Sequence, residues 1–199
     1  MLFKNLNFIY VLDSELKISE KIKKIREAVP EFPEMNQPGK DVYILHNGKS
    51  AIGLSTSQFT FIFSGEENIK VNEIVTTLNK ILKILNIKGK IRLGLKVEGF
   101  EKIELSSGEL SLAAHKQEAE ILGAVALGYR FIINNSFIHG DIKIEPYLKD
   151  EKQIFFDVVL QTIDQITPAE AEKGFKEMFA FATEKSMAAA TSLFCLKKD

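Results

Sequence analysis

Apolar and polar positions along the chain repeat with two periods, which predict strands in some segments and helices in others. Residues Phe3–Leu12 are aromatic and β-branched, which is typical of a strand. Between residues 71 and 85, apolar side chains recur every three or four positions, and this spacing predicts a long amphipathic helix. Asn86 is a typical end for that helix. Strands and helices are therefore both expected.

The order of the predicted elements occurs twice. Three strand-like segments precede one amphipathic helix across Asp41–Asn86, and the same order returns across Tyr129–Phe194. Asn47–Gly48 predicts a tight hairpin turn in the first stretch. In the second, Thr167-Pro168-Ala169-Glu170 combines a capping residue, a proline and a glutamate at the spacing of a capping box, which predicts a helix reaching about Leu193. The repeat is one of element order and not of sequence.

The segments outside this repeat are less regular. Pro30, Pro33, Pro38 and Gly39 predict a surface connection without regular structure. The remaining predictions are a helix over Glu15–Val29, a long strand over Lys90–Leu105 with a bulge or bend at Gly99, and an Ala-rich helix over Ala113–Leu127. A further strand is predicted over Gln153–Ile163; it is apolar on both faces and so expected to be covered on both sides.

These elements predict an α+β fold. Short hairpins favour antiparallel neighbours, because parallel strands would require crossover connections. We expect antiparallel strands in one curved sheet, or in two related sheets, with the long helices packed on a single face. The expected halves are residues 1–105 and 106–199, packed together as two parts or as one domain.

Composition excludes some partners. The 199 residues carry a net charge of −1, so no bulk attraction to nucleic acid or to an anionic membrane is expected. No apolar stretch approaches the roughly 20 residues that cross a bilayer, and no signal peptide is recognisable. The single cysteine, Cys195, excludes an internal disulfide and favours the cytoplasm.

The strongest candidate for chemistry is one strand. His139, Asp141, Lys143 and Glu145 alternate, so their side chains share a face, and His139, Asp141 and Glu145 are weak candidates for metal ligands, with Asp157 as a further oxygen donor. The alternative is the solvated face of an antiparallel hairpin, where polar residues alternate by default. The cation of Lys143 would also repel a metal.

The other candidates are isolated. His46 beside the Asn47–Gly48 turn is expected to be exposed, His115 lies at the start of the Ala-rich helix, and Cys195 is expected to be a buried or semi-exposed structural thiol. The glycines form no phosphate-binding loop or dinucleotide fingerprint, and no Gly-x-Ser-x-Gly motif is present. We therefore predict no catalytic residue and no cofactor.

Two groups of residues bear on partners. Phe59, Phe61 and Phe63 alternate without neighbouring Arg or Lys, which favours core packing over the stacking of nucleic-acid bases. The small residues of Met187–Ala190 permit close approach of another helix, either within the chain or from a second subunit. A homo-oligomer is therefore one expectation.

The stretch from the first helix through VYILHNGKSAIGLSTSQFTFIFSG and the strand Arg92–Glu98 resembles a family of uncharacterised, sporadically distributed bacterial proteins. FFDVVLQTID and the helix after Thr167-Pro168 are also similar to it. Lys96 and Glu98 depart from the family, which has an aromatic residue and Asn there. The resemblance implies no activity, cofactor or site residue.

Three functions remain open from the sequence. The first is a non-enzymatic binding or interaction protein that self-associates, because well-specified elements carry no accompanying chemistry. The second is small-molecule or peptide binding in a cleft between the two halves, since such interfaces favour pockets. The third is an enzyme of unfamiliar class that uses the strand bearing His139, Asp141 and Glu145.

Overall fold

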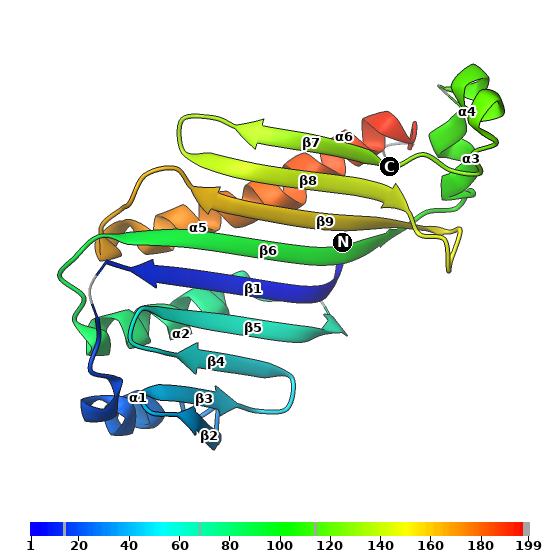
Figure 1. Ribbon diagram of the computed structural model, residues 1–199. Coiled ribbons are helices and arrows are strands. Elements are labelled where there is room, and N and C mark those ends of the chain that lie inside the picture. Colours follow the sequence, from blue (N-terminus) through cyan, green and yellow to red (C-terminus); the bar gives the residue numbers. More distant parts are fainter. Residues whose placement is uncertain (14, 68, 114, 197–199) are drawn as a thin grey trace.

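One antiparallel sheet organises the molecule. The computed structural model describes residues 1–13, 15–67, 69–113 and 115–196, and its strands lie in the order β2-β3-β4-β5-β1-β6-β9-β8-β7 (Figure 1). The strands are β1 (Leu2–Leu12), β2 (Glu34–Gly39), β3 (Val42–His46), β4 (Ser50–Leu54), β5 (Gln58–Glu67), β6 (Ile91–Lys102), β7 (Tyr129–Asn134), β8 (Ile138–Pro146) and β9 (Gln153–Thr162). The predicted α+β class is confirmed, as a single sheet of nine strands.

Helices lie between some of these strands and after the last of them. They are α1 (Ile22–Ala28), α2 (Val71–Leu85), α3 (Ser107–Leu112), α4 (Lys116–Leu122), α5 (Ala171–Ala180) and α6 (Ser186–Leu193). A π-helical segment, Phe181–Lys185, joins α5 to α6 as one long C-terminal helix, so the predicted end near Leu193 is confirmed. Thr167 and Glu170 form the predicted capping box at its start.

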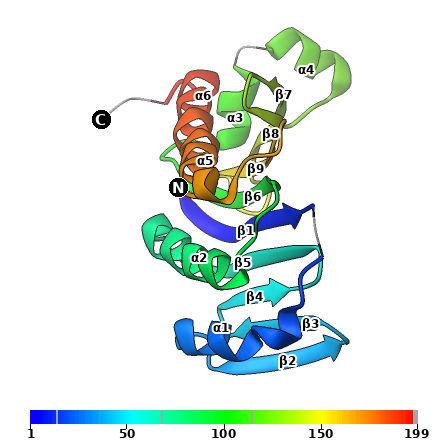
Figure 2. The same ribbon diagram turned by 90° about the vertical axis from the view of Figure 1, so that its left-hand side faces the viewer.

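The long helices cover one face of the sheet. Figure 2 shows α2, α5 and α6 on the same side of the strands, and we call the opposite side, which these three helices leave uncovered, the open face. Between the layers, Phe8 meets Phe175 edge-on with 4.6 Å between ring centroids, and Tyr10 stacks on Phe59 at 3.9 Å. The three aromatic residues predicted to share a face on β5 are all buried there, Phe59, Phe61 and Phe63.

Two predictions about strands are wrong. The segment predicted to lack regular structure contains β2, an edge strand that tolerates Pro38 because its register shifts between Asn36 and Gly39. The strand β9 was predicted to be covered on both faces, but Val159 is exposed on the open face while Val158 is buried. Apolar residues on both sides of a strand do not prove that both sides are covered.

The β1–β6 ladder is irregular at Gly99 as predicted, but the extra residue lies in β1 opposite Gly99 and not in β6. The β6–β9 ladder is regular from Gly94 to Lys102, and the register shift belongs to β1, between Phe3 and Asn5. Phe100 keeps the alternation of β6 and contacts Phe155 with 5.4 Å between ring centroids. The extra residue is therefore in β1, which sequence periodicity in β6 alone did not indicate.

The predicted helices outside the repeat are shorter than expected. A 3-10 turn at Ile18–Glu20 and α1 replace the helix predicted over Glu15–Val29. The helix predicted over Ala113–Leu127 is only α4, because Gly123 ends it in the left-handed conformation. The helix α3 was not predicted, although Ser106 accepts a hydrogen bond from the Glu109 N–H at its start.

Candidate interaction surfaces

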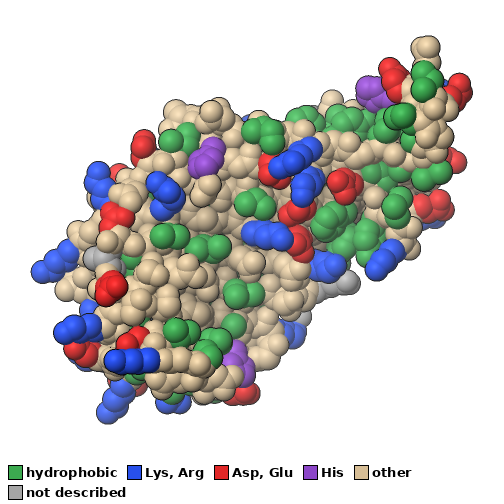
Figure 3. All heavy atoms as spheres, viewed as in Figure 1, with side chains coloured by type: hydrophobic (Ala, Val, Ile, Leu, Met, Phe, Trp, Pro, Cys, Tyr) green, Lys and Arg blue, Asp and Glu red, His purple; other side chains and the backbone are tan. Residues whose placement is uncertain are grey.

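A row of polar side chains crosses the open face in register. Successive pairing partners from β5 to β7 are Ser64, Asn5, Glu98, Asp157, Lys143 and Arg130. Ser64 Oγ donates to Asn5 Oδ1 at 2.9 Å, and Lys143 Nζ lies 3.2 Å from Asp157 Oδ2. Figure 3 shows these charges gathered on the half of the face that β6, β9, β8 and β7 form. The row results from the register of distant strands, so no local sequence signal indicates it.

Glu98 is the centre of this row. Its carboxylate accepts a hydrogen bond from Asn5 and lies 2.6 Å from Lys96 Nζ. Burial is the largest single influence and raises the pKa of Glu98, but the bonds from Lys96 and Asn5 together hold that pKa below its usual value. The same hydrogen bond to Glu98 raises the pKa of Lys96. Both groups are thus charged at neutral pH and neutralise each other.

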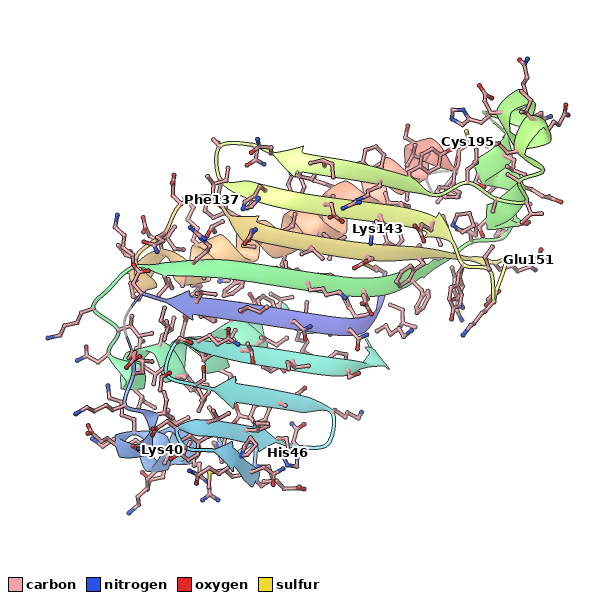
Figure 4. All side chains as sticks on the ribbon, in the orientation of Figure 1. Lys40, His46, Phe137, Lys143, Glu151 and Cys195 are labelled. Atoms are coloured by element: carbon pink, nitrogen blue, oxygen red, sulfur yellow. The ribbon has the colours of Figure 1, made fainter. Side chains whose placement is uncertain are left out.

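The strand of candidate metal ligands is β8, and its odd-numbered residues face the open side. Lys143 lies in the middle of that face (Figure 4) and pairs with Asp157. Asp141 accepts a hydrogen bond from Arg130 at 2.9 Å. His139 is half-buried and Glu145 is exposed. Within the described ranges, no three His, Cys, Asp or Glu side chains are grouped as metal ligands. The sheet therefore places Arg130 and Lys143 beside Asp141 and Asp157, and it does not gather His139, Asp141 and Glu145 into one metal site.

His46 lies on β3 near one edge of the sheet, whereas His115 and Cys195 lie at the β7 end, where the rings of His115 and Phe194 both contact Tyr129. His46 was predicted to be exposed but is half-buried, with Nδ1 3.5 Å from Glu34 on the neighbouring strand β2. His115 is exposed before α4, with its ring centroid 6.4 Å from that of Tyr129. Cys195 was predicted to be buried or half-exposed and is exposed. The neighbouring edge strand β2 partly covers His46, and the end of α6 leaves Cys195 exposed, so the surrounding structure and not the local sequence sets these exposures.

The small residues near the C-terminus pack within the chain. Ser186 and Ala190, one helical turn apart on α6, are buried, and α6 lies against β8. Ala188 is exposed on the opposite side of the helix. Intramolecular packing therefore uses one side of the small-residue stretch predicted at Met187–Ala190.

The most exposed apolar surface lies at the β7 end of the molecule. We call residues 105–113 and 115–128, which contain α3 and α4, the arm; it projects beyond β7 in Figures 1 and 2. Ile121, Leu122 and Val125 are 76%, 75% and 79% exposed, and Leu105 is also exposed. Sequence periodicity missed this surface because it placed Ile121, Leu122 and Val125 inside a longer helix and Leu105 at the end of the preceding strand.

Hydrogen bonds hold the arm in shape. Ser111 Oγ accepts from the Leu127 N–H at 2.9 Å and donates to the Gly108 carbonyl at 2.7 Å. The Tyr129 hydroxyl donates to the Ser111 carbonyl at 3.3 Å, which ties the arm to the first residue of β7. The Ser107 N–H also donates to the Glu151 carbonyl at 2.7 Å. The apolar side chains are thus presented by an ordered element.

Three grooves of the surface are each lined by residues of one half alone, either 1–105 or 106–199. One of about 220 Å³ lies on the open face, where Ala51 and Gly53 leave a depression between β3 and β5. Two others lie beside α1 and along α5. The two halves meet at the β6–β9 ladder, which runs without interruption from Gly94 to Lys102, and where α5 packs against α2 and β6. The predicted cleft between the halves has no counterpart among these three grooves.

Comparison with known proteins adds no family. No protein-family model matches the chain, and no curated protein is significantly similar to it in sequence. None of the helices in the described ranges has both the length and the hydropathy needed to span a bilayer.

Proposed function

We propose that this chain is a non-enzymatic interaction protein that binds protein partners at the β7 end of its sheet. The observation that carries the proposal is the arm, which holds Ile121, Leu122 and Val125 in solvent on a hydrogen-bonded scaffold. A cluster of large apolar side chains exposed in this way is typical of a protein or membrane contact. The acidic residues Glu118 and Glu120 on α4 favour a protein, because membrane-surface helices carry mostly Lys and Arg on their polar face.

The polar groups of the open face support the same proposal. Asp141, Glu98 and Asp157 are each paired with a cation of the same face. An active site usually brings perturbed, unpaired groups together in a concave pocket. Paired charges on a broad sheet are instead suited to a solvated or partner-facing surface. We therefore do not propose the metal-dependent enzyme that His139, Asp141 and Glu145 suggested.

We also propose that the two halves derive from one strand-strand-strand-helix unit. The order β3-β4-β5-α2 is followed later by β7-β8-β9 and the C-terminal helix. In the sheet, β5-β4-β3 lie outward from β1 on one side, and β9-β8-β7 lie outward from β6 on the other. This mirrored order supports a duplication, and superposition of the two units in relatives of this chain would test it.

The interaction role is tested by affinity capture with the full chain as bait. The variant Ile121→Ser/Leu122→Ser should lose at least about tenfold of the captured partner, because burial of two aliphatic side chains contributes about 3 kcal/mol or more. Leu148→Ser is the matched control, since Leu148 is 81% exposed in the turn between β8 and β9. A chain that is strictly monomeric in light scattering and recovers no partner would contradict the proposal.

A further inference from the structure

The strand β7 is an edge with free backbone groups. It is the last strand of the sheet, and among the residues that the structure describes it pairs with β8 alone. The Asn135 N–H donates to the Ile138 carbonyl at 3.1 Å and closes the hairpin. Because inward and outward groups alternate along an antiparallel ladder, Phe131 and Ile133 direct their N–H and C=O groups to β8. Arg130, Ile132 and Asn134 therefore direct theirs outward, away from the sheet.

The other edge of the sheet is protected, whereas the β7 edge is not. At the opposite edge, β2 carries Glu34, Pro38 and a register shift, which are features that prevent pairing with another chain. The strand β7 has neither proline nor bulge, and its one charge, Arg130, is held by Asp141 at 2.9 Å. Ile132 is 71% exposed at its centre. An exposed apolar edge of this kind favours pairing with another strand.

We propose that β7 pairs antiparallel with β7 of a second copy, with the two-fold axis at Ile132, so that one sheet runs through the dimer. In this register Arg130 faces Asn134 of the second copy, and Phe131 faces Ile133. All three outward-facing residues of each strand are then used, which forms about six backbone hydrogen bonds. No like charges face each other, whereas an axis at Arg130 would oppose two guanidinium groups.

The position of the arm is consistent with a second copy of the chain bound at β7. The arm leads directly into Tyr129, the first residue of β7, and projects on the side of the sheet where β7 is the edge (Figures 1 and 2). Antiparallel pairing brings the end of β7 and the β7–β8 turn of the second copy beside Tyr129. The exposed side chains of α4 and Val125 thus lie next to the second copy. This inference rests on the proposed interaction role and names the partner for it.

The first test measures mass by light scattering over a range of concentrations. The wild-type chain should be a dimer, and Ile132→Pro should be a monomer, because proline removes only an outward N–H and leaves the β8 ladder intact. Ile132→Lys should also give a monomer, since it places two cations on the axis. Val159→Lys is the matched control, because Val159 is exposed on the same face within the inner strand β9. It should remain dimeric.

The second test is disulfide formation in a Cys195→Ser background. Ile132→Cys should form a dimeric disulfide on mild oxidation, because paired Cα atoms on the axis lie about 5.5 Å apart, within the range of a disulfide. Leu148→Cys and Ile62→Cys, both exposed away from β7, should cross-link at least about tenfold more slowly.

Several results would overturn the inference. A dimer that persists in both Ile132→Pro and Ile132→Lys uses another surface, which refutes the β7 contact but leaves the interaction role standing. A wild-type chain that is monomeric at every concentration also refutes it, and the interaction role then depends on the capture experiment alone. A monomer that sediments with phosphatidylcholine–phosphatidylglycerol vesicles would assign the arm to a membrane instead. If Ile132→Pro does not fold, Ile132→Lys decides.

Discussion

Replacing Tyr10 by phenylalanine should stabilise the protein. Tyr10 is fully buried, and its ring stacks on Phe59 and meets Phe175 edge-on with 4.8 Å between centroids. Its hydroxyl oxygen is buried and has no hydrogen-bond partner among the described residues. Such a hydroxyl costs about 1–3 kcal/mol, and removing it leaves a void smaller than a methyl group, which costs less than about 1 kcal/mol. We expect a gain of about 1 kcal/mol and about 2–4 °C in Tm.

The gain should grow at alkaline pH. Burial, and secondarily the charge of Glu172, raises the pKa of Tyr10 far above its ordinary value of 10.0. The unfolded chain releases this proton near pH 10 and the folded chain does not. The associated stability is therefore complete below pH 10 and falls above it, by about 1.4 kcal/mol per pH unit. Phenylalanine has no such proton, so the advantage of Tyr10→Phe should exceed about 2 kcal/mol near pH 11.

Urea denaturation followed by circular dichroism, at pH 7 and near pH 11, measures both effects. Tyr129→Phe is the control, because the Tyr129 hydroxyl donates to the Ser111 carbonyl and its loss should destabilise by about 0.5–1.5 kcal/mol. If Tyr10→Phe lowers stability by 1 kcal/mol or more at pH 7, the Tyr10 hydroxyl has a partner such as a buried water. If Tyr10→Phe is more stable than the wild-type chain by the same amount at both pH values, the Tyr10 hydroxyl ionises as easily in the folded chain as in the unfolded chain.

Three further substitutions test the fold. Gly140→Ala should cost about 3 kcal/mol or more, because Gly140 has φ +155° and a Cβ there would lie 1.9 Å from the Val159 carbonyl oxygen; thermal denaturation measures it. Thr167→Ala removes the capping side chain of the C-terminal helix and should cost about 0.5–2 kcal/mol in urea denaturation. Folding lowers the pKa of Glu98 below its unfolded value of 4.5, so the ionised carboxylate stabilises the folded chain above that pH, and this stability is lost as the pH falls through the pKa of the folded state. The variant Glu98→Gln should therefore lose less stability in acid than the wild-type chain does.

Matched variants separate these effects from general damage. Gly123→Ala is the control for Gly140, since Gly123 has φ +60° and open space around it, so the change should cost only about 1–2 kcal/mol. A loss at Gly140 no larger than at Gly123 would contradict the close approach of β8 and β9. For Glu98, an acid titration of stability that is unchanged in Glu98→Gln would show that its bonds to Lys96 and Asn5 do not stabilise the folded state.

Elements with a strong local period could be predicted, and those that depend on neighbours could not. The helix α2 and the capping box at Thr167 matched expectation because their signals lie within a few residues of one another. The strand β2 was missed because only its pairing with β3 makes Pro38 acceptable in a sheet. The candidate metal strand was ambiguous for the same reason, since Arg130 and Asp157 reach its residues from other strands.

The sequence by itself determined that this is an α+β protein with antiparallel hairpins, a long C-terminal helix and no recognisable catalytic motif. Only the tertiary structure decided that β6 lies against β9, that α2, α5 and α6 all cover the same face of the sheet, and that the apolar side of α4 faces solvent. The physical reason is that a period of apolar residues specifies an apolar face but not what covers it. Strand neighbours distant in sequence, and faces left without a neighbour, are set by the packing of the whole chain.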